Sequence, residues 1–293
     1  MNLLPQTADQ KIILTLTCAD TTGIVAAVSG FLAARRYLIS EAQHHCDPYT
    51  SKSFMRTVFC ATEGNVPALS ELEASFDSAV AQRFGMSYRF YSGSRKCPVL
   101  LAVSRQGHCL TSILQRWSAG TLPIDVVGVV SNHEDLRGLA EWHRVRYHYL
   151  PVISGRKAEQ EERIKEVFEL SGAELLVLAR YMQILTPEAC SYFEGRAINI
   201  HHSFLPGFKG ARAYYQAFER GVKLIGATAH YVTTDLDEGP IIEQDVGRVE
   251  HTLSPEDFTV TGSEIESVVL NRAVKWHAEH RVFRNGRTAV VLR

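Results

Sequence analysis

The sequence predicts an α/β protein of two domains: a ferredoxin-like βαββαβ domain over residues 1–92, and a Rossmann-like domain with an open, mostly parallel sheet over residues 93–293. Three observations predict this class. The chain has 293 residues, more than one typical domain needs. A polar stretch containing Gly and Pro, residues 92–98, is typical of a domain boundary. Strands and helices alternate regularly only after that stretch.

The elements of the first domain follow from apolar periodicity. Residues 12–18 alternate between apolar residues and Thr, which predicts a strand with one buried face. Apolar residues at helical spacing then predict a helix from about residue 20 to 36, and a second one over 66–84, with Asn65 as its cap and Pro67 in its first turn. Strand patterns at 37–45, 54–61 and 86–91 complete the order βαββαβ.

The first part of the second domain has the pattern of a parallel sheet. Residues 99–104, 124–131 and 173–179 are almost continuously apolar, as expected for strands that are buried on both faces. Helical patterns separate these strands, over residues 110–117, 136–142 and 157–170. An open sheet with helices on both faces is therefore expected.

The pattern changes after residue 197. Strand patterns at 197–201, 225–233 and 240–246 are not all separated by long helices, so we expect an antiparallel edge. A helix is then predicted over residues 264–280, with Ser263 as its N-cap. The chain ends in a predicted hairpin that turns at Asn285-Gly286.

Composition excludes several classes of protein. The 31 basic and 32 acidic residues leave a net charge of -1, without the basic excess of a nucleic-acid binder. The sequence has no apolar run long enough to span a membrane, and residues 1–10 do not resemble a signal peptide. The six cysteines are scattered without a C-x-x-C pair, which is typical of a reducing compartment. We expect a cytoplasmic protein that binds neither nucleic acid nor membrane.

Candidate catalytic residues lie at the end of the predicted strand 197–201. Asn199 and His201 are two residues apart, so they share one face where ligands bind in open α/β sheets. Their alternative role is to anchor the next loop by hydrogen bonds. Asp235, Asp237 and Glu238 follow on a later loop. An acid that reached the pair would favour a charged imidazole, and the three groups together suit attack on a carbonyl.

Metal and nucleotide cofactors are not expected. His202 and His230 lack the spacing of a metal motif, and adjacent His201 and His202 should face opposite sides of the strand. The loop at residues 104–110 has a single glycine, Gly107, and neither a G-x-G-x-x-G nor a Walker pattern. Residues 178–185 can wall a pocket for a flat ring, or can simply be core.

A longer pattern carries a resemblance to a known family. It consists of Asn199-x-His201-x-Ser203, then His230, then Leu-Asp-x-Gly-Pro at residues 236–240. This pattern resembles the folate-dependent formyltransferase superfamily, and implies a formyltransferase-type second domain.

Two features narrow the resemblance. The first domain resembles an ACT domain, a module that often binds amino acids and associates through its sheets. The loop at 104–110 carries Arg105, Gln106 and His108 where the glycinamide ribonucleotide enzyme has a Ser- and Gly-rich phosphate loop. The chain thus resembles the formyltetrahydrofolate deformylases over nearly its whole length. That resemblance implies hydrolysis of 10-formyltetrahydrofolate, as substrate, to tetrahydrofolate and formate without a cofactor.

The resemblance also implies roles for individual residues. Asn199 and His201 would polarise the formyl oxygen, and Asp237 would orient the water and move protons. One departure from the family is the segment Thr261–Glu264, which stands where a sequence like Lys-Gly-Arg-Asp is usual and so lacks its basic side chains. The implied substrate-binding residues are Tyr181, Met182, Gln183, Ile184, Leu185, Ser203, His230, Asp235 and Gly239.

The ACT resemblance implies a small amino-acid effector and a homo-oligomer, a dimer or a tetramer formed through exposed sheet edges. Two alternative functions stay open. One is a formyltransferase that delivers the group to an amine, and turnover without an amine separates it from a hydrolase. The other is a non-catalytic sensor of an amino acid or folate, which would not need Asn199, His201 and Asp237 together.

Overall fold

A computed structural model describes residues 11–62, 68–208 and 212–293 of the chain. The chain divides into two compact units. The first contains the N-terminal residues up to Arg95 together with His280–Phe283 and Val290–Arg293. The second contains Lys96–Glu279 and Arg284–Ala289. The final hairpin is therefore shared between the units, although the sequence pattern placed all of it in the second domain.

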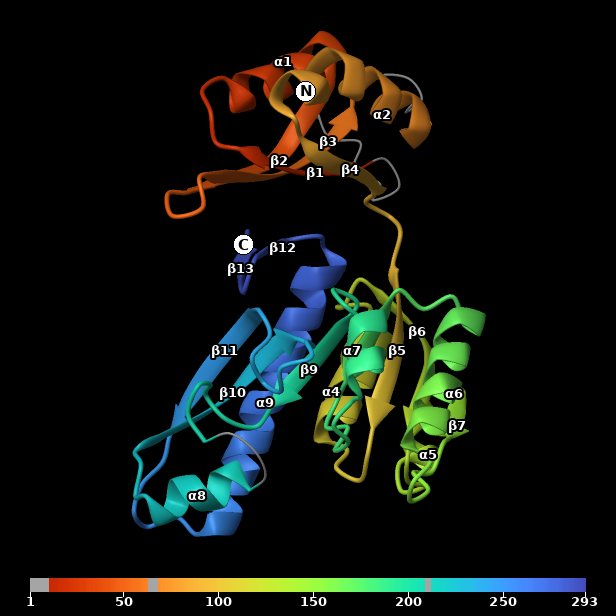
Figure 1. The fold of residues 1–293 in the computed structure, drawn as a ribbon, viewed down its shortest axis with the longest axis vertical. Helices are drawn as coiled ribbons and strands as arrows, with labels where there is room; N and C mark the ends of the chain where they lie inside the picture. The colour runs from red at the N-terminus through yellow and green to blue at the C-terminus, as the bar shows by residue number, and fades with distance from the viewer. Residues whose placement is uncertain (1–10, 63–67, 209–211) are drawn as a thin grey trace. The chain divides into compact units, whose positions relative to one another are not determined.

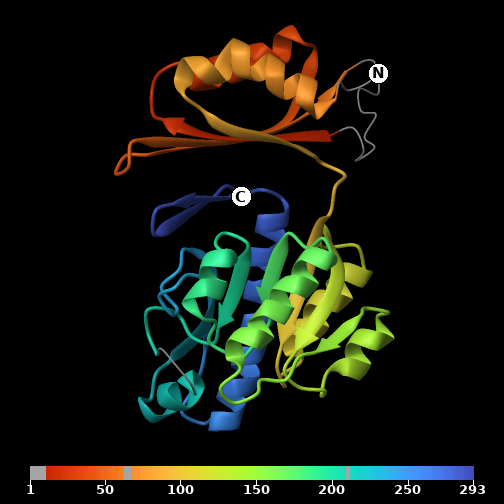
Figure 2. The same cartoon turned by 45° about the vertical axis from the view of Figure 1, so that its right-hand side comes forward.

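The first unit has the expected order βαββαβ. Its four strands form an antiparallel sheet in the order β2-β3-β1-β4, and its helices cover one face of that sheet (Figure 2). A five-residue π-helical turn continues the second helix, whose expected cap Asn65 and first-turn Pro67 lie outside the described residues. The elements are β1 (Lys11–Ala19), α1 (Ile24–Ala34), β2 (Tyr37–Asp47), β3 (Lys52–Ala61), α2 (Leu69–Phe76), η2 (Asp77–Ala81), α3 (Gln82–Phe84) and β4 (Ser87–Ser92).

The two faces of the first unit's sheet are covered differently. Under the helices, Phe76 packs edge-on against Phe31 and Phe90, with ring centroids 5.1 and 5.4 Å apart. Phe54 alternates to the opposite face, where its ring lies 5.7 Å from that of Phe283. The end of the chain joins this unit because it supplies the apolar contact that the open face requires.

The second unit is built around a seven-stranded sheet in the order β11-β10-β9-β8-β5-β6-β7 (Figure 1). β5 to β9 pair in parallel, whereas β10 and β11 form the expected antiparallel edge. The elements are β5 (Cys97–Val103), α4 (His108–Ser118), β6 (Ile124–Ser131), α5 (Arg137–Trp142), β7 (Tyr147–Tyr149), α6 (Lys157–Leu170), β8 (Leu175–Leu178), α7 (Pro187–Tyr192), β9 (Ala197–His201), α8 (Ala213–Glu219), β10 (Leu224–Tyr231), β11 (Ile241–Arg248), α9 (Pro255–Ala278), β12 (Val282–Asn285) and β13 (Thr288–Val291).

Helices cover both faces of this sheet. α6 and α7 lie on one face, where Phe168 and Phe193 join the core formed with β5 and β8 (Figure 2). α9 lies on the other face, packed beside α4 and across β9 and β10. The central strands are almost wholly buried, as their continuous apolar sequences predict.

Strand register brings the candidate catalytic residues together. Asn199 on β9 pairs with Leu178 at the end of β8, and with His230 on β10 from the other side. His201 ends β9 and pairs with Thr228. β8 runs parallel to β9 and ends beside Asn199, whereas β10 runs antiparallel and ends at Tyr231 beside Ile198. The loop after β10 must therefore turn back along β9 to reach its carboxyl end, and this loop and the one after β8 build the site.

The helix predicted over residues 264–280 starts earlier than expected. α9 begins at Pro255, and Ser254 is its N-cap: Asp257 N–H donates to Ser254 Oγ at 3.2 Å, while Ser254 N–H donates to the Asp257 carboxylate at 2.8 Å. The prediction of Ser263 as the cap is wrong, because the Ser-x-x-Asp capping box nine residues earlier already satisfies the first turn. Thr261–Glu264 lie inside the helix.

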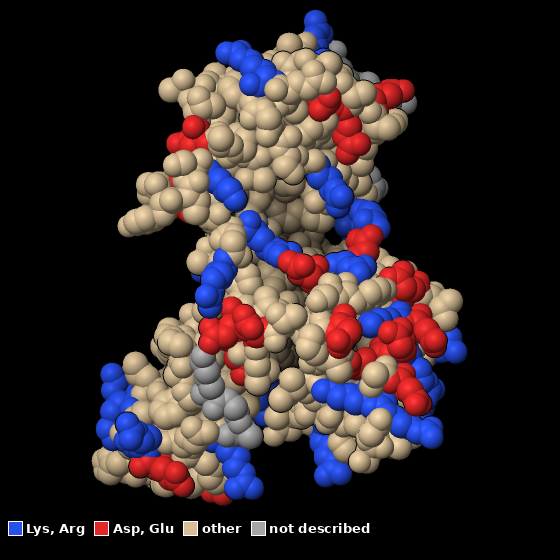
Figure 3. All heavy atoms as spheres, in the orientation of Figure 1, with Lys and Arg blue, Asp and Glu red and all other residues tan. Residues whose placement is uncertain are grey.

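Three short elements were not expected from the sequence: β7, α7 and α8. Each is seven residues or fewer, too short to show a clear period. Among the described residues, no helix has both the length and the apolar character needed to cross a membrane. On the face shown in Figure 3, acidic and basic side chains are interspersed over the second unit.

We predict that Ser254→Ala lowers the free energy of unfolding by about 1 kcal/mol, because the Asp257 N–H loses its acceptor and the Asp257 carboxylate keeps only the hydrogen bond from the backbone N–H of residue 254. Ser263→Ala is the matched control, since the Ser263 hydroxyl donates only to Thr259 O within the helix. Urea denaturation of both variants measures the difference. Equal midpoints for the two variants would contradict the assignment of the cap.

Candidate functional site

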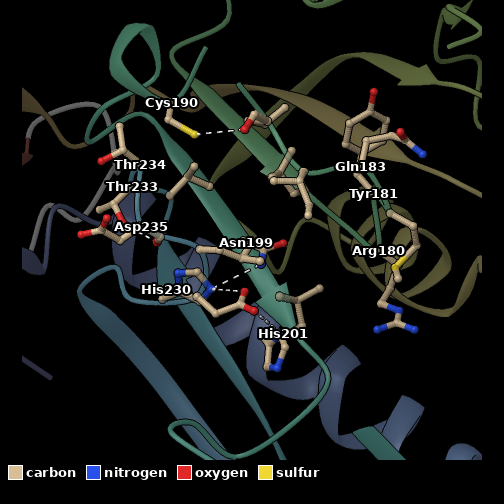
Figure 4. Close-up of a pocket in the computed structure, with 18 of the residues that line it drawn as sticks. Arg180, Tyr181, Gln183, Cys190, Asn199, His201, His230, Thr233, Thr234 and Asp235 are labelled. Atoms are coloured by element: carbon tan, nitrogen blue, oxygen red, sulfur yellow. Dashed lines mark hydrogen bonds and ion pairs between the residues drawn. The ribbon is translucent and has the colours of Figure 1, made fainter. Parts of the chain in front are cut away.

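The candidate site is a cavity of about 270 Å³ at the carboxyl ends of β8 and β9. β9 runs along its middle, with residues 180–183 on one side and residues 233–235 on the other (Figure 4). The lining residues are Leu178, Arg180, Tyr181, Met182, Gln183, Ile184, Leu185, Cys190, Asn199, Ile200, His201, His202, His230, Val232, Thr233, Thr234, Asp235, Leu236 and Asp237.

Asp237 is the acid that reaches the Asn199–His201 pair. Its Oδ2 lies 3.3 Å from His201 Nδ1, and its Oδ1 lies 3.7 Å from His230 Nε2. Asn199 Nδ2 lies 3.3 Å from the same His230 nitrogen, so the four polar groups form one connected chain (Figure 4). An amide, two imidazoles and a carboxylate therefore meet at the carboxyl end of β9.

Asp237 is ionised at neutral pH. Burial raises the pKa of its carboxyl, but hydrogen bonds from His201 and His230 outweigh burial and hold the pKa well below its usual range. The backbone of Asp237 has φ +57°, a left-handed conformation that non-glycine residues rarely adopt. Strain of this kind persists where surrounding contacts enforce it, as the two histidines do here.

The orientation of His230 follows from its backbone contact. His230 Nδ1 lies 2.9 Å from the carbonyl oxygen of Tyr231, which can only accept a hydrogen bond, so Nδ1 carries a proton. The other ring nitrogen, Nε2, faces the Asn199 amide at 3.3 Å and Asp237 Oδ1 at 3.7 Å. The second N–H of that amide is left to bind an oxygen in the cavity.

His201 and His202 do not separate as expected. Both line the cavity, with ring centroids 5.0 Å apart, because β9 ends at His201 and strand alternation ends with it. Burial, and after it the Arg180 guanidinium, lowers the pKa of His202 to about 4. His202 is thus a neutral wall of the cavity at physiological pH, and His201 Nε2 is buried without a hydrogen-bond partner in the described part of the chain.

Most of the residues expected to bind a substrate line the cavity, but two do not. Residues 181–185, His230 and Asp235 are all part of the lining. Ser203 instead donates its hydroxyl to Gly207 O at 2.6 Å and ties down the loop after β9. Gly239 lies against the backbone of Tyr231, where an added Cβ would come within 1.8 Å of the carbonyl oxygen.

Arg180 was not named as a site residue from the sequence, although it lies within the 178–185 stretch that was expected either to wall a pocket or to be core. It has φ +66°, lines the cavity, and is ion-paired at 3.3 Å with the buried carboxylate of Glu266 on α9. The two residues are 86 positions apart, so no local pattern joins them. The position of Arg180 directly after an apolar strand was the signal available, since ligands bind at such strand ends.

One group of side chains has the composition of a metal site. His108, Cys109 and Glu266 place one ligand atom each within 4.8 Å of one another. Burial raises the pKa of the Cys109 thiol well above its usual value, whereas a metal requires the thiolate. Glu266 already contacts Arg180 Nε at 3.3 Å and His108 Nε2 at 3.0 Å, so the donor set does not fit a metal ion.

Comparisons with known proteins show which family this chain resembles. A family model described as "Formyl transferase" matches residues 98–274. A formyltetrahydrofolate deformylase from Corynebacterium sp. is 46% identical over 281 residues, which cover 96% of this chain and 98% of that protein. The crystal structure of a formyltetrahydrofolate deformylase from Burkholderia mallei has a TM-score of 0.91, with 48% identity over 97% of this chain and 100% of that one.

A solved structure of a protein with a different name also shares the fold of the second unit. The crystal structure of glycinamide ribonucleotide transformylase 1 from Symbiobacterium toebii has a TM-score of 0.65 and 31% identity. It covers 68% of this chain and 95% of that one.

We predict that the protein loses stability as the pH falls from about 6.5 to 4, partly through His202. Above pH 6.5 the imidazole is neutral in both the folded and the unfolded chain, but below it only the unfolded chain takes up the proton. A pKa shifted from 6.5 to about 4 corresponds to roughly 3 kcal/mol. Urea denaturation between pH 4.5 and 7.5 should show a shallower pH dependence for His202→Asn than for the parent. An unchanged slope would exclude His202 as a source.

Proposed function

This chain belongs to the formyl transferase family and, within it, to the formyltetrahydrofolate deformylases, and we propose that it hydrolyses 10-formyltetrahydrofolate to tetrahydrofolate and formate. The observation that carries the proposal is the ionised Asp237, shared between two histidines beside Asn199. Nucleophilic attack on a formyl carbon requires donors for the oxygen and a base for the nucleophile, and these four side chains supply both.

In the proposed mechanism, the formyl oxygen accepts hydrogen bonds from Asn199 Nδ2 and from His201. The Asp237 carboxylate orients a water molecule, which attacks the formyl carbon while the two donors stabilise the negative charge that develops on the oxygen. The carbon–nitrogen bond to N10 then breaks. The proton lost by the water passes through His201 and Asp237 to N10, and formate leaves.

The substrate ring is proposed to lie between the two loops that wall the cavity. Residues 181–185 present apolar surface, with Met182 and Ile184 more than half exposed, and the 233–237 loop lies opposite. Burial raises the pKa of Tyr181 to about 12, so its hydroxyl stays protonated, and it accepts a hydrogen bond from Gln160 at 2.7 Å. Asp235 and His230 are proposed to contact polar ring atoms. The reaction is redox-neutral, and we propose that it uses no cofactor.

Ser203 and Gly239 are proposed to support the substrate site without touching the substrate. Ser203 shapes the loop after β9, and Gly239 allows the 232–240 loop to fold back onto Tyr231. Asp237 owes its position to this return of the chain, and the return requires a residue without a side chain.

We predict turnover of 10-formyltetrahydrofolate by the purified protein with no amine present. Asp237→Asn should abolish turnover while substrate affinity stays within a few-fold, since the amide cannot take up the proton.

Asn199→Ala should raise the activation free energy by about 2.7–4 kcal/mol, or lower kcat by about 10²–10³-fold, because one donor to the oxyanion is lost. Tetrahydrofolate formation measures both.

Glu238→Gln is the matched control for Asp237→Asn. Glu238 lies on the same loop but outside the cavity lining, 3.7 Å from Arg287, and its replacement should leave kcat unchanged. Turnover that begins only after an amine is added would contradict hydrolysis and favour a formyltransferase. Full activity of Asp237→Asn would remove this side chain from the mechanism.

We further propose that the first unit is an ACT-like domain that binds a small amino acid and assembles the cytoplasmic protein into a dimer or tetramer. The order βαββαβ and the sheet order β2-β3-β1-β4 support this proposal, as do two edge strands, β2 and β4, that have no neighbour on one side within the described sheet. The 46% identical deformylase covers this unit as well, since its match spans 96% of the chain.

Sedimentation velocity of the full chain tests both parts of this proposal. We predict a species of at least two subunits, and a change in sedimentation or in kcat on adding one of the twenty amino acids. A monomer at micromolar concentration would contradict assembly. A complete lack of response to every amino acid would leave the unit with a structural role only.

A further inference from the structure

A buried carboxylate, Glu266, joins four segments of the second unit beside the catalytic cavity. Its side chain is 1% exposed and lies in the middle of α9. Glu266 Oε2 lies 3.0 Å from His108 Nε2 and 3.3 Å from Arg180 Nε, and Oε1 accepts a hydrogen bond from the Tyr214 hydroxyl at 2.7 Å. The segments joined are the start of α4, the turn after β8, α8 and α9.

This cluster separates two hollows. Arg180, at one end, lines the catalytic cavity of about 270 Å³. His108, at the other end, lines a second, more open hollow of similar volume, whose other residues are Thr259, Val260, Ser263, Glu264 and Ser267. The bonded chain Arg180–Glu266–His108, which we call the barrier, therefore runs from one hollow to the other.

Several contacts hold the barrier in place. Arg180 Nε also donates to Gln106 Oε1 at 2.8 Å, so the guanidinium is held from two sides. Burial raises the pKa of the Glu266 carboxyl, but the hydrogen bond from His108 and the Arg180 charge reverse the shift and lower it, so the carboxylate is ionised. A buried charge that loses its partner is strongly destabilised, and this disfavours opening of the barrier.

We propose that the barrier makes the site selective for water by closing the path along which a larger nucleophile, a primary amine, would reach the formyl carbon. This inference rests on the proposed function. The same fold occurs in a glycinamide ribonucleotide transformylase, so the fold alone does not decide between hydrolysis and transfer. The barrier decides between the two reactions because its side chains fill the space beside His201 and His202 that an amine would need.

Both reactions share their first steps. In hydrolysis, water adds to the formyl carbon, the bond to N10 breaks, N10 gains a proton, and formate and one proton are released. In transfer, an amine adds to the same carbon, the same bond breaks, the proton of the amine passes to N10, and a formamide is released. No oxidant, reductant or further reactant is needed in either case, so access of the nucleophile is sufficient to decide the product.

Arg180→Gly is the variant that tests the barrier. Glycine removes the side chain and suits the left-handed backbone of this position, φ +66°, so the turn itself is not strained. The protein is incubated with 10-formyltetrahydrofolate labelled with ¹³C in the formyl group, and with glycinamide as a small primary amine. Carbon NMR then separates labelled formate from labelled formylglycinamide.

The parent protein should form formate alone, and Arg180→Gly should raise the ratio of formylglycinamide to formate by about tenfold or more, the range that steric exclusion of a small group provides. Arg105→Ala is the matched control, because Arg105 is an exposed arginine in the loop between β5 and α4 and is not one of the three residues of the barrier. It should leave the ratio unchanged.

His108→Ala independently tests the end of the barrier that lies at the second hollow. If circular dichroism shows that Arg180→Gly is unfolded, His108→Ala alone tests the proposal. It should also raise the ratio, by a smaller factor. Folded variants that form formate but no more formylglycinamide than the parent would overturn the barrier and leave hydrolysis intact. A parent protein that forms no formate without glycinamide would instead overturn the proposed function.

Discussion

The sharing of one carboxylate between two histidines is the interaction on which the site depends. Asp237 reaches both His201 and His230 only because β9 and β10 pair with Asn199 opposite His230, and because the chain after β10 turns back sharply onto Tyr231. The turn demands a residue without a side chain at Gly239 and a left-handed backbone at Asp237. The contacts of Asp237 with the two histidines therefore compensate for the strain of its backbone. The strained loop, for its part, holds the carboxylate oxygens of Asp237 in position.

Glu266 is a second buried carboxylate, and it too is held by polar partners from several elements. Glu266 is contacted by a guanidinium, an imidazole and a hydroxyl, and Asp237 by two imidazoles, so each carboxylate has polar partners within the fold. His202 lies near both groups and stays neutral, because burial and the Arg180 charge oppose its protonation. An uncharged imidazole thus lies near both carboxylates, Asp237 in the lining of the cavity and Glu266 behind it.

Much of the fold could be predicted from the sequence, because long apolar runs and helical stripes report burial directly. The 124–131 strand and the 157–170 helix were predicted with their observed ends, and Asn199 and His201 share the cavity as their spacing indicated. Arg180 and Glu266 could not be paired in advance, since their contact is formed by packing between distant elements. The start of α9 was missed because the Ser254 capping box was overlooked in favour of a later serine.

The final hairpin has a consequence for how the chain can be divided. Residues 280–283 and 290–293 belong to the first unit, yet the tip between them, residues 284–289, belongs to the second. Neither unit is a continuous stretch of sequence, so a gene fragment ending after the fourth strand would encode a sheet that lacks Phe283 over Phe54 and Arg281 beside Glu41.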